Sequence, residues 1–470
     1  MLYSKINTFD SILPYPATWN AGEGLFSLDQ GIKILSSPEF TDSGKRLLKI
    51  ADFLQIPVKD NGKTILLQQT RSVEPGNWKI TVTTGNVILE SNDYAGMMYA
   101  VSALSQMLSI ATMSGPGRFA GLNCGSAEDH PRFNWRGFML DSARHFCSPE
   151  QVKELLHLLA YYRFNVFHWH LTDNEGWRTP SEIYPELSRC YELEEGFYSK
   201  QDLKEICELA ANLNIRIVPE IDWPGHSRLL TENIPDFRCE NCDPGDELCI
   251  GSDEVREKVA ALLAEFMDLF PDSTEIHLGG DEADPAHWEN CPLCQNALKT
   301  KNLPDVRALE HDFMLGLVDQ VRAAGKTPIV WCDSGVYPKD VIVQLWCSKG
   351  RMAALENGNP VIDSNCAFFY CNRLLDNAEP QYADNQPVSI IEDTYGYEPL
   401  GGYPQFANQL LGVEGCVWTG YLPERLMMSK VMPRLPAFSE IMWGKPQHKC
   451  WSGFYGRWLR LRSAGLEYIW

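Results

Sequence analysis

Short apolar runs that end in polar or aromatic residues recur along the chain from residue 131 onward. Most of the runs are separated by stretches in which apolar residues recur at helical spacing. The eight runs cover residues 137–144, 166–173, 216–222, 275–282, 328–333, 341–347, 360–365 and 415–419. Strands that alternate with amphipathic helices favour a parallel sheet, and this number of units predicts an α/β fold, a (β/α)8 TIM barrel over residues 131–470.

One of the intervening segments carries a helix-start signal. Ser148 is placed to cap the helix, Pro149 to occupy its first turn and Gln151 to complete a capping box. In a barrel of this kind the chemistry lies at the C-terminal ends of the strands. The residues at these predicted ends are Asp141, Arg144, Asp173, Asp222, Asp281, Glu282, Trp331, Trp346 and Trp418.

Residues 1–125 follow a different pattern, with short alternating runs before a predicted hairpin and a helix. The segment WKITVTTGNVILES indicates two strands joined around Thr84 and Gly85. Residues 94–108 then show the apolar spacing of a helix. Strands followed by a covering helix predict a small α+β domain. The Gly- and Ser-containing residues 113–131 are expected to link it to the barrel.

Composition and charge narrow the classes of partner. The 470 residues have the composition of an ordinary soluble globular protein, and their net charge of −21 would repel nucleic acid. No uninterrupted apolar run reaches about 18 residues, so a membrane span is not expected. The start of the chain lacks the basic and apolar segments of a secretory signal, and its 15 cysteines are scattered, which favours a reducing cytoplasm. The sequence gives no indication of an oligomeric state.

The run HLGGDE brings two adjacent acids, Asp281 and Glu282, to the predicted barrel mouth. Consecutive residues near a strand end point in different directions. They therefore do not suit the pair of carboxylates about 5 Å apart that an ordinary retaining glycosidase needs. They could instead play unlike roles, one protonating a leaving group and the other orienting part of the substrate. Alternatively, Asp281 caps the following helix and Glu282 is a solvated first-turn acid.

Two histidines and three tryptophans offer further chemistry. His168 and His170 have the spacing of a barrel metallohydrolase pair, but Trp331 and Trp346 stand where such an enzyme would need further histidines. We therefore favour a hydrogen-bonded core role for at least one histidine.

Three large aromatic residues, Trp331, Trp346 and Trp418, stand at predicted strand ends and would be costly to expose at a barrel mouth unless a ligand covers them. Sugar rings and acetyl methyls suit such a wall.

Several segments occur in a characteristic order along the chain: WRGFMLDSARHF, NVFHWHLTDNEGWR, VPEIDWPGHS, EIHLGGDEA, VWTGYLPERL and PRLPAFSEIMW. In these segments the chain resembles glycoside hydrolase family 20, the β-N-acetylhexosaminidases. The resemblance covers residues 131 to the end, and LPYPATW with the helix at 94–108 is similar to the family's N-terminal domain. The resemblance implies exo-hydrolysis of a terminal β-linked GlcNAc or GalNAc from a glycan, without a catalytic cofactor.

The resemblance also assigns roles, because in this family the substrate's own acetamido oxygen attacks the anomeric carbon. Glu282 would act as the general acid and then the base, and Asp281 would orient the acetamido N–H. Tyr370 would donate its hydroxyl to the acetamido oxygen. The residues implied in substrate binding are Arg144 and Asp173 at O3 and O4, His226 beside Glu282, and Trp331, Trp346 and Trp418 around the acetyl group.

Two positions depart from the family pattern. Gly420 stands two residues after Trp418, where the family usually has a Glu, and Asn372 stands two residues after Tyr370, in place of an Asp. Both changes fall on the O4 and O6 side of the sugar, so the pocket is expected to be more open there, unless Glu424 substitutes. Alternatives are therefore a relative that releases 6-sulfo-GlcNAc or a disaccharide, although Arg144 argues against the latter, and a glycan-binding protein without turnover.

Two CxxC steps suggest a metal site away from this chemistry. Cys239 and Cys242 follow the third predicted strand, and Cys291 and Cys294 follow the acid pair. Four thiolates are the number that a tetrahedral structural zinc takes, and loops after neighbouring strands could meet. Cys249 is an alternative ligand, and free or disulfide-linked cysteines are the alternative state.

Overall fold

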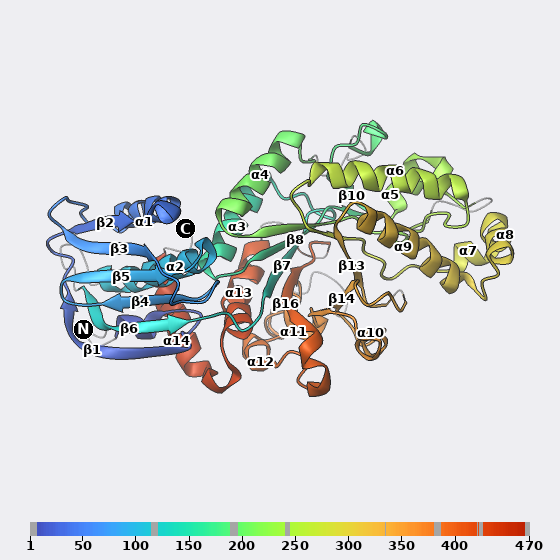
Figure 1. The fold of residues 1–470 in the computed structure, drawn as a ribbon. Coiled ribbons are helices and arrows are strands. Elements are labelled where there is room, and N and C mark those ends of the chain that lie inside the picture. The colour runs from blue at the N-terminus through green and yellow to red at the C-terminus, as the bar shows by residue number, and fades with distance from the viewer. Residues whose placement is uncertain are drawn as a thin grey trace.

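A computed structural model of the protein places a mixed sheet beside a closed barrel (Figure 1). The structure describes residues 7–113, 121–188, 196–239, 245–333, 335–379, 387–420, 422 and 426–465. Cys242 and Glu424 lie outside these residues. In the described part of the chain no helix is both long enough and apolar enough to cross a membrane.

The N-terminal sheet has six strands in the order β1-β6-β4-β5-β3-β2. Their bounds are β1 Thr18–Phe26, β2 Ile32–Ser36, β3 Lys63–Gln69, β4 Trp78–Val82, β5 Asn86–Ser91 and β6 Leu122–Asp129. The predicted hairpin is present, since β4 and β5 pair antiparallel and the N–H of Thr83 donates to the carbonyl of Asn86 at 2.8 Å. The expected linker is wrong over residues 122–129, because β6 pairs there with both β1 and β4. The sheet thus reaches Asp129, beyond the boundary expected at residue 125.

The helix α2 (Tyr94–Thr112) joins the sheet to the barrel. Nearly all of its residues are buried, unlike those of α1 (Thr41–Phe53), which has one exposed face. The hydroxyl of Ser102 donates to the carbonyl of Tyr161 at 2.7 Å, and the ring of Tyr99 packs edge-on against Trp443 with centroids 4.9 Å apart. The C-terminal helix α14 (Trp451–Ala464) also contacts α2. A helix buried on all sides indicates one continuous core across the two units.

The barrel closes with eight parallel strands, as predicted. In chain order they are β7 Trp135–Asp141, β8 Val166–His170, β11 Arg216–Glu220, β12 Glu275–His277, β13 Thr327–Trp331, β14 Ile342–Leu345, β15 Val361–Asp363 and β16 Leu410–Val417. A small hairpin, β9 Thr172–Asp173 with β10 Gly176–Trp177, follows β8. Each strand overlaps one of the predicted apolar runs, although β16 begins five residues before the run placed at 415–419, so the (β/α)8 barrel after a small α+β domain is confirmed.

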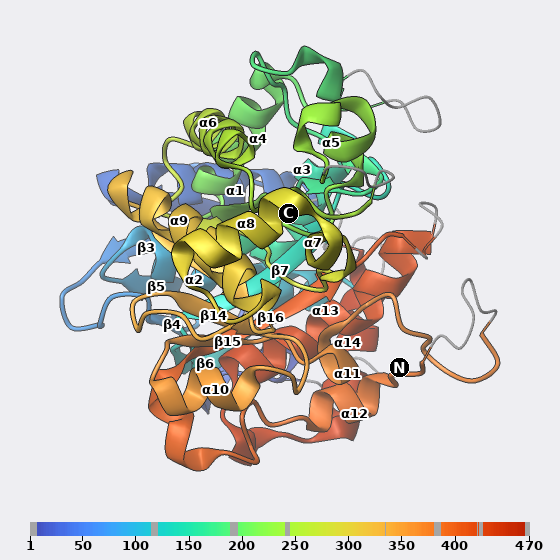
Figure 2. The ribbon, with the colours of Figure 1, turned by 90° about the vertical axis from the view of Figure 1, so that its right-hand side faces the viewer.

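The helices around the barrel are less regular than its strands. They are α3 Pro149–Tyr161, α4 Lys200–Asn212, α5 Arg228–Asn233, α6 Asp253–Leu269, α7 Ala286–Asn290, α8 Pro292–Lys301, α9 Val306–Ala323, α10 Arg351–Asn357, α11 Cys366–Phe369, α12 Ile391–Gly396 and α13 Met427–Trp443. The capping box expected at α3 is present, with Ser148 and Gln151 bonded reciprocally. The helices α7 and α8 follow β12 at the end of the molecule opposite the N-terminal sheet (Figure 1), and Figure 2 faces that end.

Candidate active site

The loop after β12 carries the two adjacent acids, and two glycines give it its shape. Gly279 and Gly280 have φ angles of +67° and +98°, in the left-handed region that favours glycine. A Cβ on Gly279 would lie 1.7 Å from Oδ1 of Asp222. The N–H of Gly280 donates to that same oxygen at 3.0 Å. The glycines therefore let this loop dock directly against the end of β11.

Asp281 is buried at the barrel mouth, with 8% of its surface exposed. Its Oδ1 is buried and has no hydrogen-bond partner in the described part of the chain. Burial raises the pKa of Asp281 to about 7, although His226 opposes this shift. A carboxylate oxygen without a partner at this place is suited to accept a hydrogen bond from a ligand N–H.

Glu282 has the opposite environment, since 58% of its side chain is exposed. Its φ of +52° is unusual for a residue with a side chain, and its N–H donates to Oδ2 of Asp333 at 3.3 Å. The alternative in which Asp281 caps a helix is wrong, because α7 begins only at Ala286, whose N–H is bonded by Asp284. The two acids thus differ in exposure, as unlike roles require.

His226 lies between the acids and a second carboxylate. Its Nδ1 is 3.1 Å from Oδ1 of Asp173, and its Nε2 is 3.8 Å from Asp281 and 3.9 Å from Glu282. Burial would lower the pKa of His226, but the carboxylates of Asp222 and Asp173 outweigh it and hold the pKa well above its ordinary value. The imidazolium therefore carries a positive charge next to both acids of the loop.

Arg144, which is partly exposed, and the buried Asp173 form an ion pair at the same end of the barrel. Nη2 of Arg144 lies 2.7 Å from Oδ2 of Asp173, and Nε2 of His170 lies 2.8 Å from that oxygen. Burial alone would raise the pKa of Asp173, but Arg144 and His226 hold it well below its ordinary value. The guanidinium of Arg144 also packs over the ring of Trp418, 5.1 Å from its centroid. Polar groups of this pair are therefore fixed beside an aromatic wall.

Three of the aromatic residues expected at the mouth are brought together. The rings of Trp331 and Trp418 are 6.1 Å apart, and the ring of Tyr370 is 6.0 Å from Trp418. The fourth, Trp346, donates its indole N–H to Oδ1 of Asp333 at 3.0 Å, and Asp333 also accepts the N–H of Glu282. Burial holds the pKa of Tyr370 well above its ordinary value, so its hydroxyl remains a donor.

A buried polar network lies beneath this wall. Glu220 accepts the indole N–H of Trp331 at 2.8 Å and contacts His168, His170 and His277. His168 is also bonded to Glu414 at 2.7 Å, and although burial favours the neutral ring, Glu414 and Glu220 raise the pKa of His168 to about 9. His168 and His170 are thus core residues paired with carboxylates, as favoured from the sequence.

Sequence reasoning missed two residues that organise the site. Asp333 holds both Trp346 and the backbone of Glu282, and Glu220 orients Trp331. The signal for Glu220 was an acid inside an otherwise apolar barrel strand, which requires partners when buried. Asp333 follows a strand end by two residues and gave no comparable signal.

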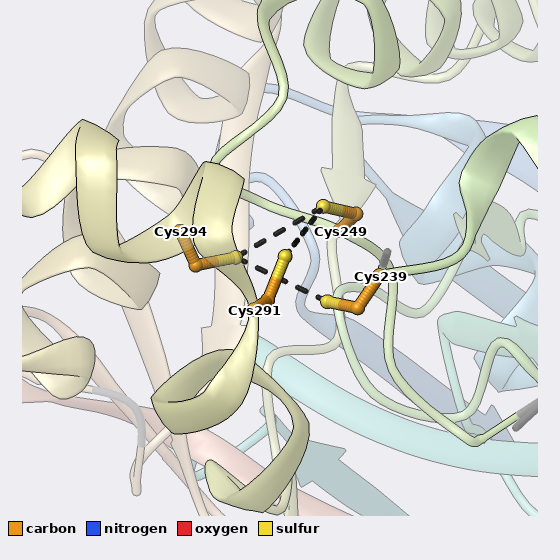
Figure 3. Close-up of side chains that lie close together, drawn as sticks. All are labelled: Cys239, Cys249, Cys291 and Cys294. Carbon is orange, nitrogen blue, oxygen red and sulfur yellow. Dashed lines mark hydrogen bonds between the residues drawn. The ribbon is translucent and has the colours of Figure 1, made fainter. Parts of the chain in front are cut away.

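Three of the predicted metal ligands also come together, on the loops beside the mouth. Cys239, Cys291 and Cys294 cluster with Cys249 (Figure 3). The predicted ligand Cys242 lies outside the described residues, and Cys249, the alternative, occupies the fourth place.

Comparison with known proteins agrees with this geometry. Residues 133–446 match the family "Glycosyl hydrolase family 20, catalytic domain", and residues 10–130 match its "domain 2". A "Beta-hexosaminidase" of Akkermansia muciniphila is 31% identical over 84% of this chain and 85% of its own length. One of Vibrio furnissii is 29% identical over 91% of this chain and 76% of its own.

Solved structures are similar across almost the whole chain. An exo beta-N-acetylglucosaminidase from Vibrio harveyi, in complex with N-acetylglucosamine, has a TM-score of 0.87 and 27% identity over 98% of this chain and 78% of its own. A beta-N-acetylhexosaminidase from Bacteroides fragilis has a TM-score of 0.85 and 27% identity over 98% of this chain and 96% of its own. The catalytic-domain match alone covers more than half of the chain, and the domain 2 match covers most of the rest: the chain belongs to glycosyl hydrolase family 20.

Proposed function

We propose that this glycoside hydrolase, an exo-acting β-N-acetylhexosaminidase, uses Asp281 and Glu282 for substrate-assisted hydrolysis of a terminal β-linked N-acetylhexosamine. The observation that carries the assignment is the contrast between a buried Asp281 with a bare Oδ1 and an exposed Glu282 one residue later. The named relatives support the substrate class, since they are hexosaminidases and one of them holds N-acetylglucosamine.

The reaction proceeds in two steps. Glu282 donates its proton to the glycosidic oxygen while the acetamido oxygen of the sugar attacks the anomeric carbon, so the aglycone leaves as an alcohol and an oxazolinium ring forms. Glu282, now a carboxylate, then takes a proton from water as the water opens the ring with overall retention. Two inversions at one carbon account for the retained configuration.

Asp281 and Tyr370 hold the internal nucleophile. The bare oxygen of Asp281 accepts the acetamido N–H, and its negative charge stabilises the positive charge that develops on the ring. The Tyr370 hydroxyl donates to the acetamido oxygen, and Trp331, Trp346 and Trp418 surround the methyl group. A wall of this kind restricts the acetamido group to poses that can attack.

Arg144 and Asp173 bind the hydroxyls O3 and O4. Their ion pair fixes the partly exposed guanidinium of Arg144 in place, and His226 links Asp173 to the acids. Recognition of both hydroxyls requires that they carry no further sugar, which accounts for exo cleavage. Differences from the family pattern on the O4 and O6 side of the sugar should therefore affect which sugar is accepted.

The O4 and O6 side is proposed to be permissive. A Cβ on Gly420 would lie 2.8 Å from Cδ of Arg144, so a Glu at this position would meet the arginine stem unless one of them moved. We therefore expect both GlcNAc and GalNAc to be accepted, and a C6 sulfate to be tolerated. Hydrolysis of only one epimer, with the other more than about 100-fold slower, would contradict this part of the proposal.

A panel of nitrophenyl glycosides tests the acetamido nucleophile. The β-GlcNAc, β-GalNAc and 6-sulfo-GlcNAc glycosides should be cleaved, whereas the β-glucoside should not, because it lacks the attacking group. A thiazoline analogue of the intermediate should inhibit competitively. Turnover of the β-glucoside at the same rate as the β-GlcNAc glycoside would contradict the proposed mechanism.

Replacement of the general acid tests the role of Glu282. Glu282→Gln should lower kcat about 100-fold or more on alkyl glycosides, which need protonation, and much less on dinitrophenyl glycosides. Glu289→Gln, on the exposed face of α7, is the matched control and should leave both rates unchanged. An equal loss on both kinds of leaving group would assign Glu282 another role.

A further inference from the structure

Four cysteines from two separate segments converge beside the loop that carries the acid pair (Figure 3). Cys239 and Cys249 come from the stretch between α5 and α6, and Cys291 and Cys294 flank the start of α8. All four side chains are buried. We propose that Cys239, Cys249, Cys291 and Cys294 bind one structural Zn²⁺ ion, and that this ion fixes the base of the loop bearing Asp281 and Glu282.

The sulfur positions fit a tetrahedral metal and not a pair of disulfides. The Sγ atoms lie 4.0 Å apart for Cys239 and Cys294, 3.7 Å for Cys249 and Cys291, and 4.0 Å for Cys249 and Cys294. All four lie within 4.8 Å of one another. A Zn–S bond of about 2.3 Å in a regular tetrahedron places the sulfurs about 3.8 Å apart. A disulfide would need about 2.05 Å.

The surroundings favour the charge of such a centre. Zn²⁺ displaces one proton from each thiol, so four protons leave and a centre with a net charge of −2 remains. Cys291 is the N-cap residue of the ten-residue helix α8, and Cys294 lies in its first turn. The positive end of the helix dipole therefore faces two of the four sulfurs. Tetrahedral sulfur sites suit zinc or iron, and zinc is preferred here because hydrolysis transfers no electrons.

The segment 245–251 packs closely against the metal-binding turn. A Cβ on Gly251 would lie 2.3 Å from Cα of Cys294, so only glycine allows this approach. The N–H of Cys249 donates to the carbonyl of Phe237 at 2.9 Å, which holds the Cys239 side of the cluster. The four cysteines are thus positioned by backbone contacts on both segments.

The same segment supports the chain that leaves the acid pair. The N–H of Asp284 donates to Glu247 at 3.1 Å, and the indole N–H of Trp288 donates to the carbonyl of Leu248 at 2.8 Å. A metal that crosslinks Cys249 to Cys291 would therefore add a third link between the segment 245–251 and residues 284–291, and would restrict the movement of these residues. This positioning role rests on the proposed function of Glu282, whereas metal binding itself does not.

Metal content of the full-length protein is the first test. Protein purified without chelators or metal-affinity resin should contain about one zinc per chain by elemental analysis, and X-ray absorption should give four sulfurs at about 2.3 Å. Titration with a mercurial reagent should release that zinc to a colorimetric indicator. Protein that holds no zinc, or holds iron in its place, overturns the proposal.

Serine variants identify the ligands. Cys249→Ser and Cys294→Ser should each lose the zinc, whereas Cys242→Ser and Cys450→Ser, an exposed cysteine of the last helix region, should retain it. Loss of zinc in the Cys242 variant with retention in the Cys249 variant would overturn the assigned set. Where a ligand variant does not fold, the mercurial titration and the absorption spectrum of the unmodified protein still decide.

The positioning role has its own readout. Mercurial removal of zinc should lower kcat with little change in KM, and added Zn²⁺ with excess thiol should restore it. Glu282→Gln should keep a full zinc complement, so a failure of the catalytic assignment is distinguishable from a failure of the metal site. Unchanged kcat after zinc loss would overturn the role given to the loop.

Discussion

Asp281 and Glu282 are consecutive in the chain, yet the fold gives them opposite surroundings. Burial raises the pKa of Asp281 to about 7, while 58% of the Glu282 side chain is exposed. The backbone of Glu282 is left-handed, with φ +52°, and both carboxylates still approach the same nitrogen of His226, at 3.8 and 3.9 Å. Such strained residues persist where the surrounding structure holds them, and here Asp333 bonds the Glu282 N–H.

The raised pKa of Asp281 makes stability depend on pH. In the native state the carboxyl keeps its proton up to about pH 7, whereas in the unfolded chain it ionises near 3.8. Ionisation therefore costs stability as the pH rises between these values, at most about 1.4 kcal/mol per unit. Asp281→Asn should raise Tm relative to the unmodified protein at pH 8, show no such gain near pH 4, and lower kcat at every pH.

Asp173 provides a control of opposite sign. Its pKa is held well below its ordinary value, so its ionised form contributes stability that is present above pH about 4 and lost as the pH falls. Asp173→Asn should therefore lower Tm at pH 8. Thermal unfolding of both variants from pH 4 to 8 measures the two trends, and a gain in Tm for both, or for neither, would contradict the assigned electrostatics.

The same titration should appear in catalysis. Because the acetamido N–H is bound by the ionised form of Asp281, kcat/KM should fall below pH about 7. Asp281→Asn should remove this fall of kcat/KM at low pH, the acid limb of the pH profile, along with most of the activity. A limb that persists in the variant would belong to another group.

Single residues were predictable from the sequence where local motif and strand position coincided. The acid pair, Arg144 and the strand-end tryptophans were found this way, because a barrel brings all strand ends to one mouth. Asp333 and Glu220 were not, since their roles depend on partners 13 to 111 residues away. Cys249 was considered only as an alternative ligand, because the loop path that brings it beside Cys291 and Cys294 is not encoded in the spacing of the cysteines.

At the scale of elements, the capping box at the start of α3 contributes to helix stability. Ser148 accepts the N–H of Gln151 at 3.3 Å, and the side chain of Gln151 accepts the Ser148 N–H at 2.7 Å. Ser148→Ala should cost about 1 kcal/mol of stability, seen as a small fall in Tm. KM should be unchanged, because Arg144 is held by Asp141 and Asp173 and not by the cap.

A serine outside any cap is the matched comparison. Ser463 is exposed near the end of α14, and its hydroxyl bonds only the carbonyl of Leu459 among the contacts in the described residues. Ser463→Ala should therefore leave Tm within measurement error. Equal losses for the two serines would indicate that the capping box contributes nothing specific.

Barrel strands were easier to predict than the strands of the N-terminal sheet. Buried parallel strands are continuous apolar runs, which the sequence displays directly. The edge strand β1 is almost entirely exposed, and β6 has the composition LNCGSAED, which is typical of a loop. The structure of β6 comes from pairing with β1 on one side and β4 on the other, so it depends on tertiary context and not on local preference.

At the scale of the whole molecule, α2 and Asp129 hold the N-terminal sheet against the end of the barrel opposite the mouth. Asp129 is buried, lies 3.1 Å from Nη1 of Arg163 and accepts the indole N–H of Trp443 at 2.7 Å. Burial lowers the pKa of Arg163 to about 10, with Asp129 opposing the shift. Removal of the sheet would leave this guanidinium without its carboxylate and would expose the face that α2 covers.

Deletion of residues 1–130 should therefore give an insoluble or partly unfolded barrel. Solubility, gel filtration and binding of a hydrophobic dye measure the outcome. Asp129→Asn in the full-length protein, which keeps the covering sheet, should remain soluble with a lower Tm. A soluble, monodisperse deletion variant with an unchanged Tm would mean that the sheet is a dispensable attachment.

The contacts of α14 with α2 and with the 3-10 helix Thr8–Ser11 bring the first and last described elements to one side of the molecule, away from the mouth. A tag, a fusion partner or a solid support attached next to either of these elements would then lie on the side of the molecule opposite the mouth. An immobilised preparation should keep its full rate even on bulky glycoproteins, which makes the orientation useful for preparative trimming of glycans.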